Sequence, residues 1–139
     1  MSEASGEIHT ELLIMHNSDD IVKAMDITRS LAELTGFSEH DCVLLQLVTE
    51  EACMNAFEHG CPMGNCEFRI SWTVDADAME ITVCQSGEFE LQPNREAPLK
   101  GGSRGRGLIL IQSIMDETRL IPTGIYVSLV MRKGRGHAH

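Results

Sequence analysis

The sequence predicts an α+β fold, a two-layer α/β sandwich in which three helices cover one face of a mainly antiparallel sheet. Two observations carry this prediction. Segments with apolar residues at helical spacing alternate along the chain with segments in which every second residue is apolar, so helices and strands are both expected. The strands of the C-terminal half are joined by short turns, which favours antiparallel pairing. The chain has 139 residues, and we assign residues 1–139 to a single domain because this length is typical of one.

The N-terminal segments predict a strand followed by a helix. Residues 8–15 alternate loosely, with Leu12 and Ile14 on one phase, and this pattern favours a strand. Ser18 and the two aspartates after it can accept hydrogen bonds from the free N–H groups of a first helical turn. Apolar residues then recur at helical spacing until Gly36, which should end the helix.

The middle of the chain predicts a second helix and a hairpin. Ser38 precedes a helical segment that should extend to about Gly60. Residues 66–74 then alternate cleanly between apolar and polar, with Trp72 on the inward phase. A turn rich in aspartate leads into a partner strand, and Gln85 continues the inward phase of that strand.

The C-terminal segments predict a lid, a third helix and two strands. Glycines and prolines gather between about 87 and 104, and a long loop in a small domain is often a functional lid. The third helix is expected from Arg104 to Asp116. The last strand should end at Arg132, and the tail from about 133 to 139 is expected to fray.

Charge and cysteine content narrow the classes of function. The chain has 11 basic and 21 acidic residues and a net charge of −10, which argues against nucleic acid or an anionic membrane as the main partner. No apolar run is long enough to span a membrane, and the acidic first residues do not resemble a signal peptide. The five cysteines are an odd number without a Cys-x-x-Cys pair, so reduced thiols and a cytoplasmic location are expected.

The second helix carries the strongest indication of a functional site. At about 100° per residue, Glu51, Asn55 and His59 continue the apolar side of the helix. Cys53 falls on the opposite side. A carboxylate within an apolar stripe is costly unless it is paired, so this row is either a hydrogen-bonded helix end or a set of ligands facing a cavity. Glu and Asn offer the oxygen ligands that Mg²⁺ requires, and a Glu can also accept a proton from a hydroxyl group.

A glycine-rich run before the third helix gives the second indication. This run, from Gly101 to Gly107, contains Arg104 and Arg106. Glycines allow close approach of the backbone, and the N-terminus of a helix attracts anions. Basic residues in a loop are often merely solvated. Together with the acidic and amide row of the second helix, however, this run indicates a phosphate on one side and its metal ion on the other.

These two segments resemble motifs of a known family. Residues 48–60, Val-Thr-Glu-Glu-Ala-Cys-Met-Asn-Ala-Phe-Glu-His-Gly, resemble the N box of the GHKL (Bergerat-fold) ATPases. Residues 105–111, Gly-Arg-Gly-Leu-Ile-Leu-Ile, resemble their second Gly box. Both boxes occur in the right order within residues 8–133, and the chain is most similar to the small stand-alone anti-sigma factor serine kinases of bacteria.

The resemblance implies an ATP-binding domain and a role for each candidate residue. Glu51 would be the catalytic general base, and Asn55 would hold the Mg²⁺ ion that bridges the phosphates. The other candidate cofactor-binding residues are His59, Gln85, Gly87, Arg104, Gly105, Arg106, Gly107 and Leu108. The substrate would be a serine on a small antagonist protein of the STAS fold, and a sigma factor would be a further partner. Such kinases are typically homodimers.

The first Gly box departs from the pattern of the family. The family has Asp-x-Gly-x-Gly after an apolar strand, and its Asp accepts a hydrogen bond from the adenine amino group. In this chain Gln85 replaces the Asp, Gly87 is kept and the second glycine is absent. A neutral amide is a weaker acceptor than an ionised carboxylate. Two alternatives to an active kinase are therefore considered: a non-catalytic regulatory module that binds nucleotide weakly, and the catalytic fragment of a sensor histidine kinase.

Overall fold

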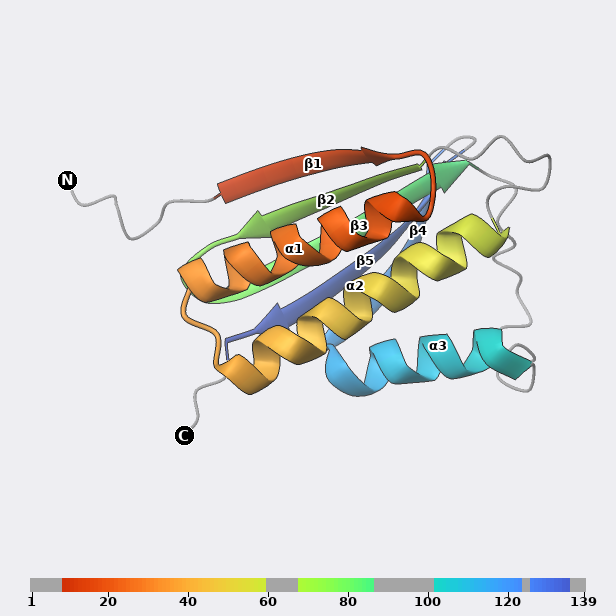
Figure 1. The fold of residues 1–139 in the computed structure, drawn as a ribbon. Helices are drawn as coiled ribbons and strands as arrows, with labels where there is room; N and C mark the ends of the chain where they lie inside the picture. Colours follow the sequence, from red (N-terminus) through yellow and green to blue (C-terminus); the bar gives the residue numbers. More distant parts are fainter. Residues whose placement is uncertain (1–8, 60–67, 87–101, 124–125, 136–139) are drawn as a thin grey trace.

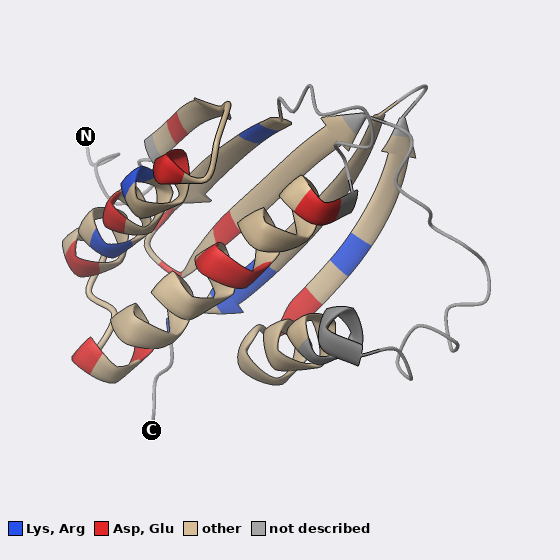
Figure 2. Cartoon of the chain, turned by 45° about the vertical axis from the view of Figure 1, so that its right-hand side comes forward, with Lys and Arg blue, Asp and Glu red and all other residues tan. Residues whose placement is uncertain are grey.

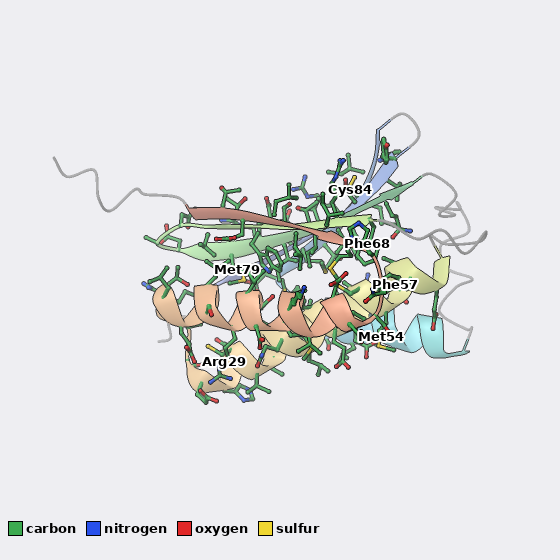
Figure 3. All side chains as sticks on the ribbon, turned by 45° about the horizontal axis from the view of Figure 1, so that its top comes forward. Arg29, Met54, Phe57, Phe68, Met79 and Cys84 are labelled. Atoms are coloured by element: carbon green, nitrogen blue, oxygen red, sulfur yellow. The ribbon has the colours of Figure 1, made fainter. Side chains whose placement is uncertain are left out.

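The computed structural model describes residues 9–59, 68–86, 102–123 and 126–135. The described elements follow in the order β1 (His9–Met15), α1 (Asp19–Leu34), α2 (Glu39–His59), β2 (Phe68–Val74), β3 (Ala78–Ser86), α3 (Gly102–Ile114), β4 (Glu117–Thr123) and β5 (Tyr126–Gly134). The five strands form one sheet in the order β1-β2-β3-β5-β4, and every neighbouring pair is antiparallel. All three helices lie on one face of this sheet (Figures 1 and 3). The predicted two-layer α+β fold is confirmed.

The start of α1 is capped by aspartate and asparagine side chains rather than by Ser18. Within the described part of the chain, the side chain of Ser18 makes no capping hydrogen bond. The Asp20 carboxylate instead accepts hydrogen bonds from the backbone N–H groups of His16 at 2.8 Å and Asn17 at 3.3 Å. These bonds, the one from His16 above all, hold the pKa of Asp20 below its usual value. The side-chain oxygen of Asn17 accepts a hydrogen bond from the N–H of Asp19 at 2.9 Å. Of the three residues that the sequence offered, Asp20 accepts hydrogen bonds at the helix start and Ser18 does not.

The turn between α1 and α2 forms as predicted. Gly36 has a φ angle of 90°, a left-handed conformation that glycine adopts without a steric penalty. The hydroxyl oxygen of Ser38 accepts a hydrogen bond from the N–H of Asp41 at 3.1 Å. This bond satisfies one of the free donors in the first turn of α2.

The hairpin of β2 and β3 also forms as predicted. One carboxylate oxygen of Asp75 accepts hydrogen bonds from the N–H groups of Asp77 at 2.8 Å and Ala78 at 3.0 Å. These two bonds lower the pKa of Asp75. Because the turn fixes the register, the inward residues of the two strands face the helices together, and Trp72 is completely buried.

The exposed and buried faces of β1 can now be distinguished. The side chains of Leu12 and Ile14 are 58% and 40% exposed, whereas Met15 is completely buried and Leu13 packs against the core. Residues 8–15 carry apolar side chains on both phases, so alternation alone did not show which phase faces the helices. Leu12 and Ile14, the residues that the sequence pattern placed on one phase, lie on the exposed face.

The central position of α2 explains an error in the sequence interpretation. α2 lies between α1 and α3 and over the sheet (Figure 1), so three of its sides are covered. The side facing α1 includes Thr49, whose hydroxyl contacts that of Thr28. Cys53, which the wheel placed opposite the apolar side, is completely buried. The residues of α2 with the least exposure are Cys42, Leu45, Val48, Thr49, Ala52, Cys53 and Ala56.

A chain of hydrogen bonds through the core ties α1 and α2 to the sheet. The indole N–H of Trp72 donates to the hydroxyl oxygen of Thr28 at 2.8 Å. The hydroxyl of Thr49 donates to the carbonyl oxygen of Leu45 at 2.9 Å. Since each hydroxyl has a single proton, Thr28 must donate to Thr49 across their 2.7 Å contact. Every polar group in this series of hydrogen bonds is therefore paired, so its burial carries no penalty for an unpaired donor or acceptor.

Three boundaries near the C-terminus differ from prediction. α3 ends at Ile114 rather than at Asp116. α3 begins at Gly102, so part of the glycine-rich run lies inside the helix rather than before it. β5 extends to Gly134, past the predicted end at Arg132, because the N–H of Gly134 donates to the Asp116 carboxylate at 2.7 Å. Of the lid predicted at about 87–104, residues 102–104 belong to α3 and residues 87–101 lie outside the described part of the chain. Of the tail predicted at about 133–139, residues 133–134 belong to β5 and residues 136–139 lie outside the described part.

Among the residues that the structure describes, acidic side chains are concentrated on the helical layer. Figure 2 shows the acidic positions gathered along α1 and α2.

In the described residues, no helix is both long enough and apolar enough to cross a membrane.

Candidate functional site

The polar row of α2 lies against α3 at a glycine. Glu51 and Asn55, one helical turn apart, are both partly exposed and share one side of α2. Gly107 of α3 is buried opposite them. A β-carbon at Gly107 would lie 2.9 Å from Oε1 of Glu51 and 3.6 Å from Nδ2 of Asn55. The absence of a side chain at this position therefore lets the backbone of α3 approach both polar groups.

This contact gives Gly107 a structural role in the packing of α3 against α2, which the sequence alone did not reveal. The motif suggested that Gly107 offers backbone N–H to phosphate, and the structure shows that it also makes room for the Glu51 carboxylate. A glycine within a helix costs about 1 kcal/mol relative to alanine. A glycine retained inside a helix despite this cost indicates that another group approaches the backbone closely at that position.

The first turns of α3 provide a favourable environment for an anion. The N-terminus of a helix carries a partial positive charge and free N–H groups. The first turn of α3 contains no acidic residue, so no side chain of its own compensates that charge. Gly105 lies in this part of the helix. The side chains of Arg104 and Arg106 are outside the described part of the structure.

Gln85 lies at the C-terminal end of β3, on the helix-facing side of the sheet. It pairs with Val127 of β5 and follows the buried residues Ile81 and Val83 at alternate positions. Only 6% of its surface is exposed, which confirms that it points inward. In the described part of the structure, its side-chain nitrogen Nε2 is buried and has no hydrogen-bond partner.

The end of the helical layer brings these elements together. Figure 1 shows the C-terminal ends of β3 and α2 and the N-terminal end of α3 at the same end of the molecule. α2 contacts both β3 and α3. The N-terminus of α3 and the unpartnered amide of Gln85 therefore lie at this end of the molecule, and the carboxylate of Glu51 and the carboxamide of Asn55 lie on the helix between them.

Cys53 and Cys84, two described cysteines next to predicted site residues in the sequence, do not offer a nucleophile to the site. Burial raises the pKa of the Cys53 thiol to about 12, so the thiolate is not formed near neutral pH. Cys84 alternates with Gln85 and lies on the helix-free face of the sheet (Figure 3). Neither thiol therefore belongs to the site between α2 and α3.

The predicted site residues can be placed one by one. Glu51, Asn55 and Gly107 meet at the contact between α2 and α3. Leu108 is half-buried beside them in α3, and Gln85 is buried at the end of β3. His59 is the last residue of α2, but its side chain lies outside the described part of the structure. Gly87 also lies outside the described residues.

Comparison with known families decides the classification. Residues 15–133 match the family described as the histidine kinase-like ATPase domain. The chain belongs to this family. The predicted membership of the GHKL ATPases is thereby confirmed.

Individual members of the histidine kinase-like ATPase family show where this chain stands within it. The serine-protein kinase RsbW of Bacillus licheniformis (strain ATCC 14580) is 30% identical over 114 residues, which cover 71% of this chain and 70% of the relative. A second RsbW sequence from Bacillus licheniformis is 29% identical over 113 residues, which cover 71% and 69%. Among solved structures, the SiaB-SiaC complex from Pseudomonas aeruginosa contains a chain that superposes with a TM-score of 0.61 at 13% identity. That match covers 86% of this chain and 88% of the other, and it shows a shared fold.

The residues of this histidine kinase-like ATPase domain fit a Mg²⁺-nucleotide. In the described ranges, no group of three His, Cys, Asp or Glu side chains could hold a metal ion alone. Mg²⁺ commonly takes one or two protein ligands and completes its shell with phosphates and water. Asn55, beside Gly107, would offer its carboxamide oxygen as such a ligand, and the buried Nε2 of Gln85 is a donor that a bound group would satisfy.

Proposed function

We propose that this chain is an ATP- and Mg²⁺-dependent protein serine kinase. Its substrate would be a small STAS-type antagonist protein in a bacterial partner-switching system. The observation that carries the proposal is the contact of Glu51 and Asn55 with the buried Gly107. Membership of the histidine kinase-like ATPase family and 30% identity to a serine-protein kinase support it.

The proposed chemistry assigns a distinct task to each side chain. Glu51 accepts the proton of the substrate serine hydroxyl, because a carboxylate held near the reacting group can act as general base. Asn55 is neutral and offers a carboxamide oxygen to Mg²⁺. The N-terminus of α3 offers backbone N–H groups and partial positive charge to phosphate oxygens. ATP supplies the transferred phosphoryl group, and Mg²⁺ offsets its charge when bound.

The proposal includes the setting in which the kinase acts. By resemblance to the stand-alone anti-sigma factor kinases, its second partner is a sigma factor, its assembly is a homodimer and its location is the cytoplasm. Phosphorylation of the antagonist would decide which of the two proteins the kinase holds.

One observation favours a second candidate function. Gln85 stands where the family has an aspartate, and a neutral amide binds an amino group less strongly than a carboxylate does. The alternative is a non-catalytic regulatory module that keeps the fold and its partner surface but binds nucleotide weakly or not at all.

Calorimetric titration separates the two functions. ADP, and ATP with Mg²⁺, are titrated into the purified chain, into Asn55→Ala and into Met54→Ala. Met54 is an exposed neighbour on α2 and serves as the matched control. The kinase proposal expects micromolar binding that weakens in Asn55→Ala and not in Met54→Ala. The absence of heat and of any thermal shift at millimolar nucleotide would refute it and favour the non-catalytic module.

Catalysis is tested separately by intact mass measurement of a STAS-domain protein from the same genome. Incubation with the chain, ATP and Mg²⁺ should add the mass of one phosphoryl group. Unchanged mass for every STAS protein of that genome, despite nucleotide binding, would contradict the proposed phosphotransfer.

A further inference from the structure

The side of α2 that faces away from the sheet carries exposed apolar side chains. Val43, Leu47 and Met54 follow one another at intervals of four and seven residues, so they lie along one line of the helix. Val43 and Met54 are 48% and 43% exposed, and Leu47 is half-buried. Figure 3 shows Met54 on the side of the helical layer opposite the sheet. We call these three residues the outer stripe of α2.

The packing of the fold does not require apolar residues on this side of α2. The outer side of a helix in a two-layer fold usually carries polar residues, because water covers it. The sides of α2 toward α1, α3 and the sheet are already covered by those elements (Figure 1). The outer stripe is the remaining side, and it is apolar as well.

The apolar surface extends from α2 onto α1. Val22 is 61% exposed and lies two turns before Arg29 on the same side of α1. Since the Arg29 guanidinium contacts the side chain of Gln46 in α2, this side of α1 borders α2. Single exposed apolar residues are common on protein surfaces, whereas an apolar surface shared by two helices is typical of an interaction site.

The border of the outer stripe is acidic. Glu50 lies between two residues of the stripe, Glu58 lies one turn beyond Met54, and α2 contains no lysine or arginine. The basic residues of α1, Lys23 and Arg29, are each paired with acidic side chains of α1 or α2. Figure 2 shows the resulting excess of acidic positions along both helices.

The charge of this border indicates which partner the stripe fits. Nucleic acid and anionic membranes are repelled by it. A second copy of the chain would place its own acidic border against this one, and like charges across an interface are unfavourable.

The helical backbone of α2 indicates the form of the partner. Its N–H and C=O groups are paired within the helix, so a partner contacts side chains and cannot extend a sheet here. From Val43 to Met54 the stripe is about 16 Å long, at 1.5 Å per residue, which about three turns of a second helix would cover. A helix with apolar residues on one side and lysine or arginine beside them complements both the stripe and its border.

We propose that the outer stripe of α2 is a docking surface for a basic amphipathic helix of a partner protein. The apolar side of the partner helix covers the stripe, and its lysines or arginines lie beside Glu50 and Glu58. Glu51 and Asn55 lie against Gly107 of α3 instead. The inference therefore does not rest on the proposed phosphotransfer, and either one can fail without the other.

The test uses a synthetic peptide of about 16 residues as the probe, with leucines at helical spacing and lysines at the other positions. A twin peptide has glutamate in place of each lysine. Binding of each fluorescently labelled peptide is measured by anisotropy, without nucleotide, to the unmodified chain, to Met54→Lys and to Leu12→Lys. Leu12 is 58% exposed on the helix-free face of the sheet, so Leu12→Lys introduces the same charge away from the stripe. A thermal melt of each variant confirms that it is folded.

We expect the lysine peptide to bind the unmodified chain with a dissociation constant in the micromolar range. Met54→Lys should weaken this binding roughly tenfold or more, because the new ammonium group interrupts the apolar stripe and repels the lysines of the peptide. Leu12→Lys should change the dissociation constant by less than about threefold. The glutamate twin should bind at least roughly tenfold more weakly than the lysine peptide, because its carboxylates meet the acidic border.

Four results would overturn the proposed docking surface. Equal weakening in Met54→Lys and Leu12→Lys would show that the peptide responds to the net charge of the chain alone. Equal binding of both peptides would show that the acidic border has no influence. The absence of binding at about millimolar peptide would show that the stripe does not hold a basic helix. If sedimentation shows that the chain self-associates, and that Met54→Lys but not Leu12→Lys prevents it, the occupant of the stripe is a second copy.

Discussion

Gly107 and Glu51 are so close that a β-carbon on the glycine would lie 2.9 Å from Oε1 of the glutamate. Real β-carbons do not approach an oxygen this closely without displacement of one group. Gly107 belongs to α3 and Glu51 to α2, so a side chain at this position of α3 would displace the carboxylate end of Glu51. The position of the proposed general base and the packing of the helical layer are therefore coupled.

We predict that Gly107→Ala impairs the site more than it impairs the fold. The added methyl group must displace Glu51 or separate the helices, and a displacement of about 1 Å at a catalytic group can cost about 100-fold in rate. Alanine also favours a helix over glycine by about 1 kcal/mol, which offsets part of the strain. The rate of phosphotransfer to the STAS substrate and a thermal melt measure the two effects separately.

The double variant Gly107→Ala, Glu51→Ala is the control for this prediction. With the carboxylate removed, the nearest atoms to the new methyl group are Nδ2 and Oδ1 of Asn55 at 3.6 and 3.9 Å, which are ordinary contacts, so the melting temperature should exceed that of Glu51→Ala alone. Normal ADP affinity and phosphotransfer in Gly107→Ala would show that the close contact is unimportant.

The side chain of Glu51 should matter for proton transfer rather than for binding. Glu51→Gln keeps the shape but cannot accept the serine proton, so phosphotransfer to the STAS substrate should fall by roughly 10²- to 10⁴-fold. The affinity for ADP should stay close to that of the unmodified chain. Glu50→Gln, at the half-buried neighbouring position, is the matched control and should leave the rate unchanged. An equal loss of phosphotransfer rate in Glu51→Gln and Glu50→Gln would show that the rate depends on the net charge of this helix segment and not on Glu51 as a general base.

Segments in which apolar and polar residues follow one strict period were predicted correctly. Segments in which apolar residues fit more than one period or phase were not. Residues 68–74 alternate without exception, and the strand and its hairpin were confirmed. β1 carries apolar residues on both phases, and burial depends on which phase meets the helices, a tertiary property. The same limit applied to α2, because a helix covered on three sides has no single apolar face.

The candidate site was predictable in its residues but not in its geometry. Glu51 and Asn55 could be selected because polar residues on one side of a helix, one turn apart, are chemically informative. The contact with Gly107 is formed between α2 and α3, which are separated in the sequence by β2 and β3, so spacing in the sequence could not reveal it. The unmet donor of Gln85 likewise became visible only when its buried surroundings were known.

The hydrogen-bond chain from Trp72 through Thr28 to Thr49 predicts a specific stability defect. Thr28→Val preserves the shape of the side chain but removes the partner of the indole N–H and of the Thr49 hydroxyl. Leaving such buried groups unmet costs about 1–3 kcal/mol. Urea unfolding monitored by the fluorescence of the single tryptophan measures the loss. Thr28→Ser keeps the hydroxyl and should lose less stability; a larger loss in Thr28→Ser would show that packing, not hydrogen bonding, dominates here.

The cap of α1 predicts how stability depends on pH. The pKa of Asp20 is lowered in the folded chain, chiefly by the hydrogen bond from the His16 N–H. A carboxyl group with a depressed folded pKa stabilises the fold above its unfolded pKa of about 3.9, and that stabilisation is lost as the pH falls through the lower folded value. Asp20→Asn keeps an accepting oxygen but removes the charge. The variant should therefore be less stable than the unmodified chain at neutral pH, with a difference that shrinks as the solution is acidified below about pH 4. Urea unfolding at a series of pH values measures this difference, and a gap that stays constant from neutral to acid would contradict a charged cap.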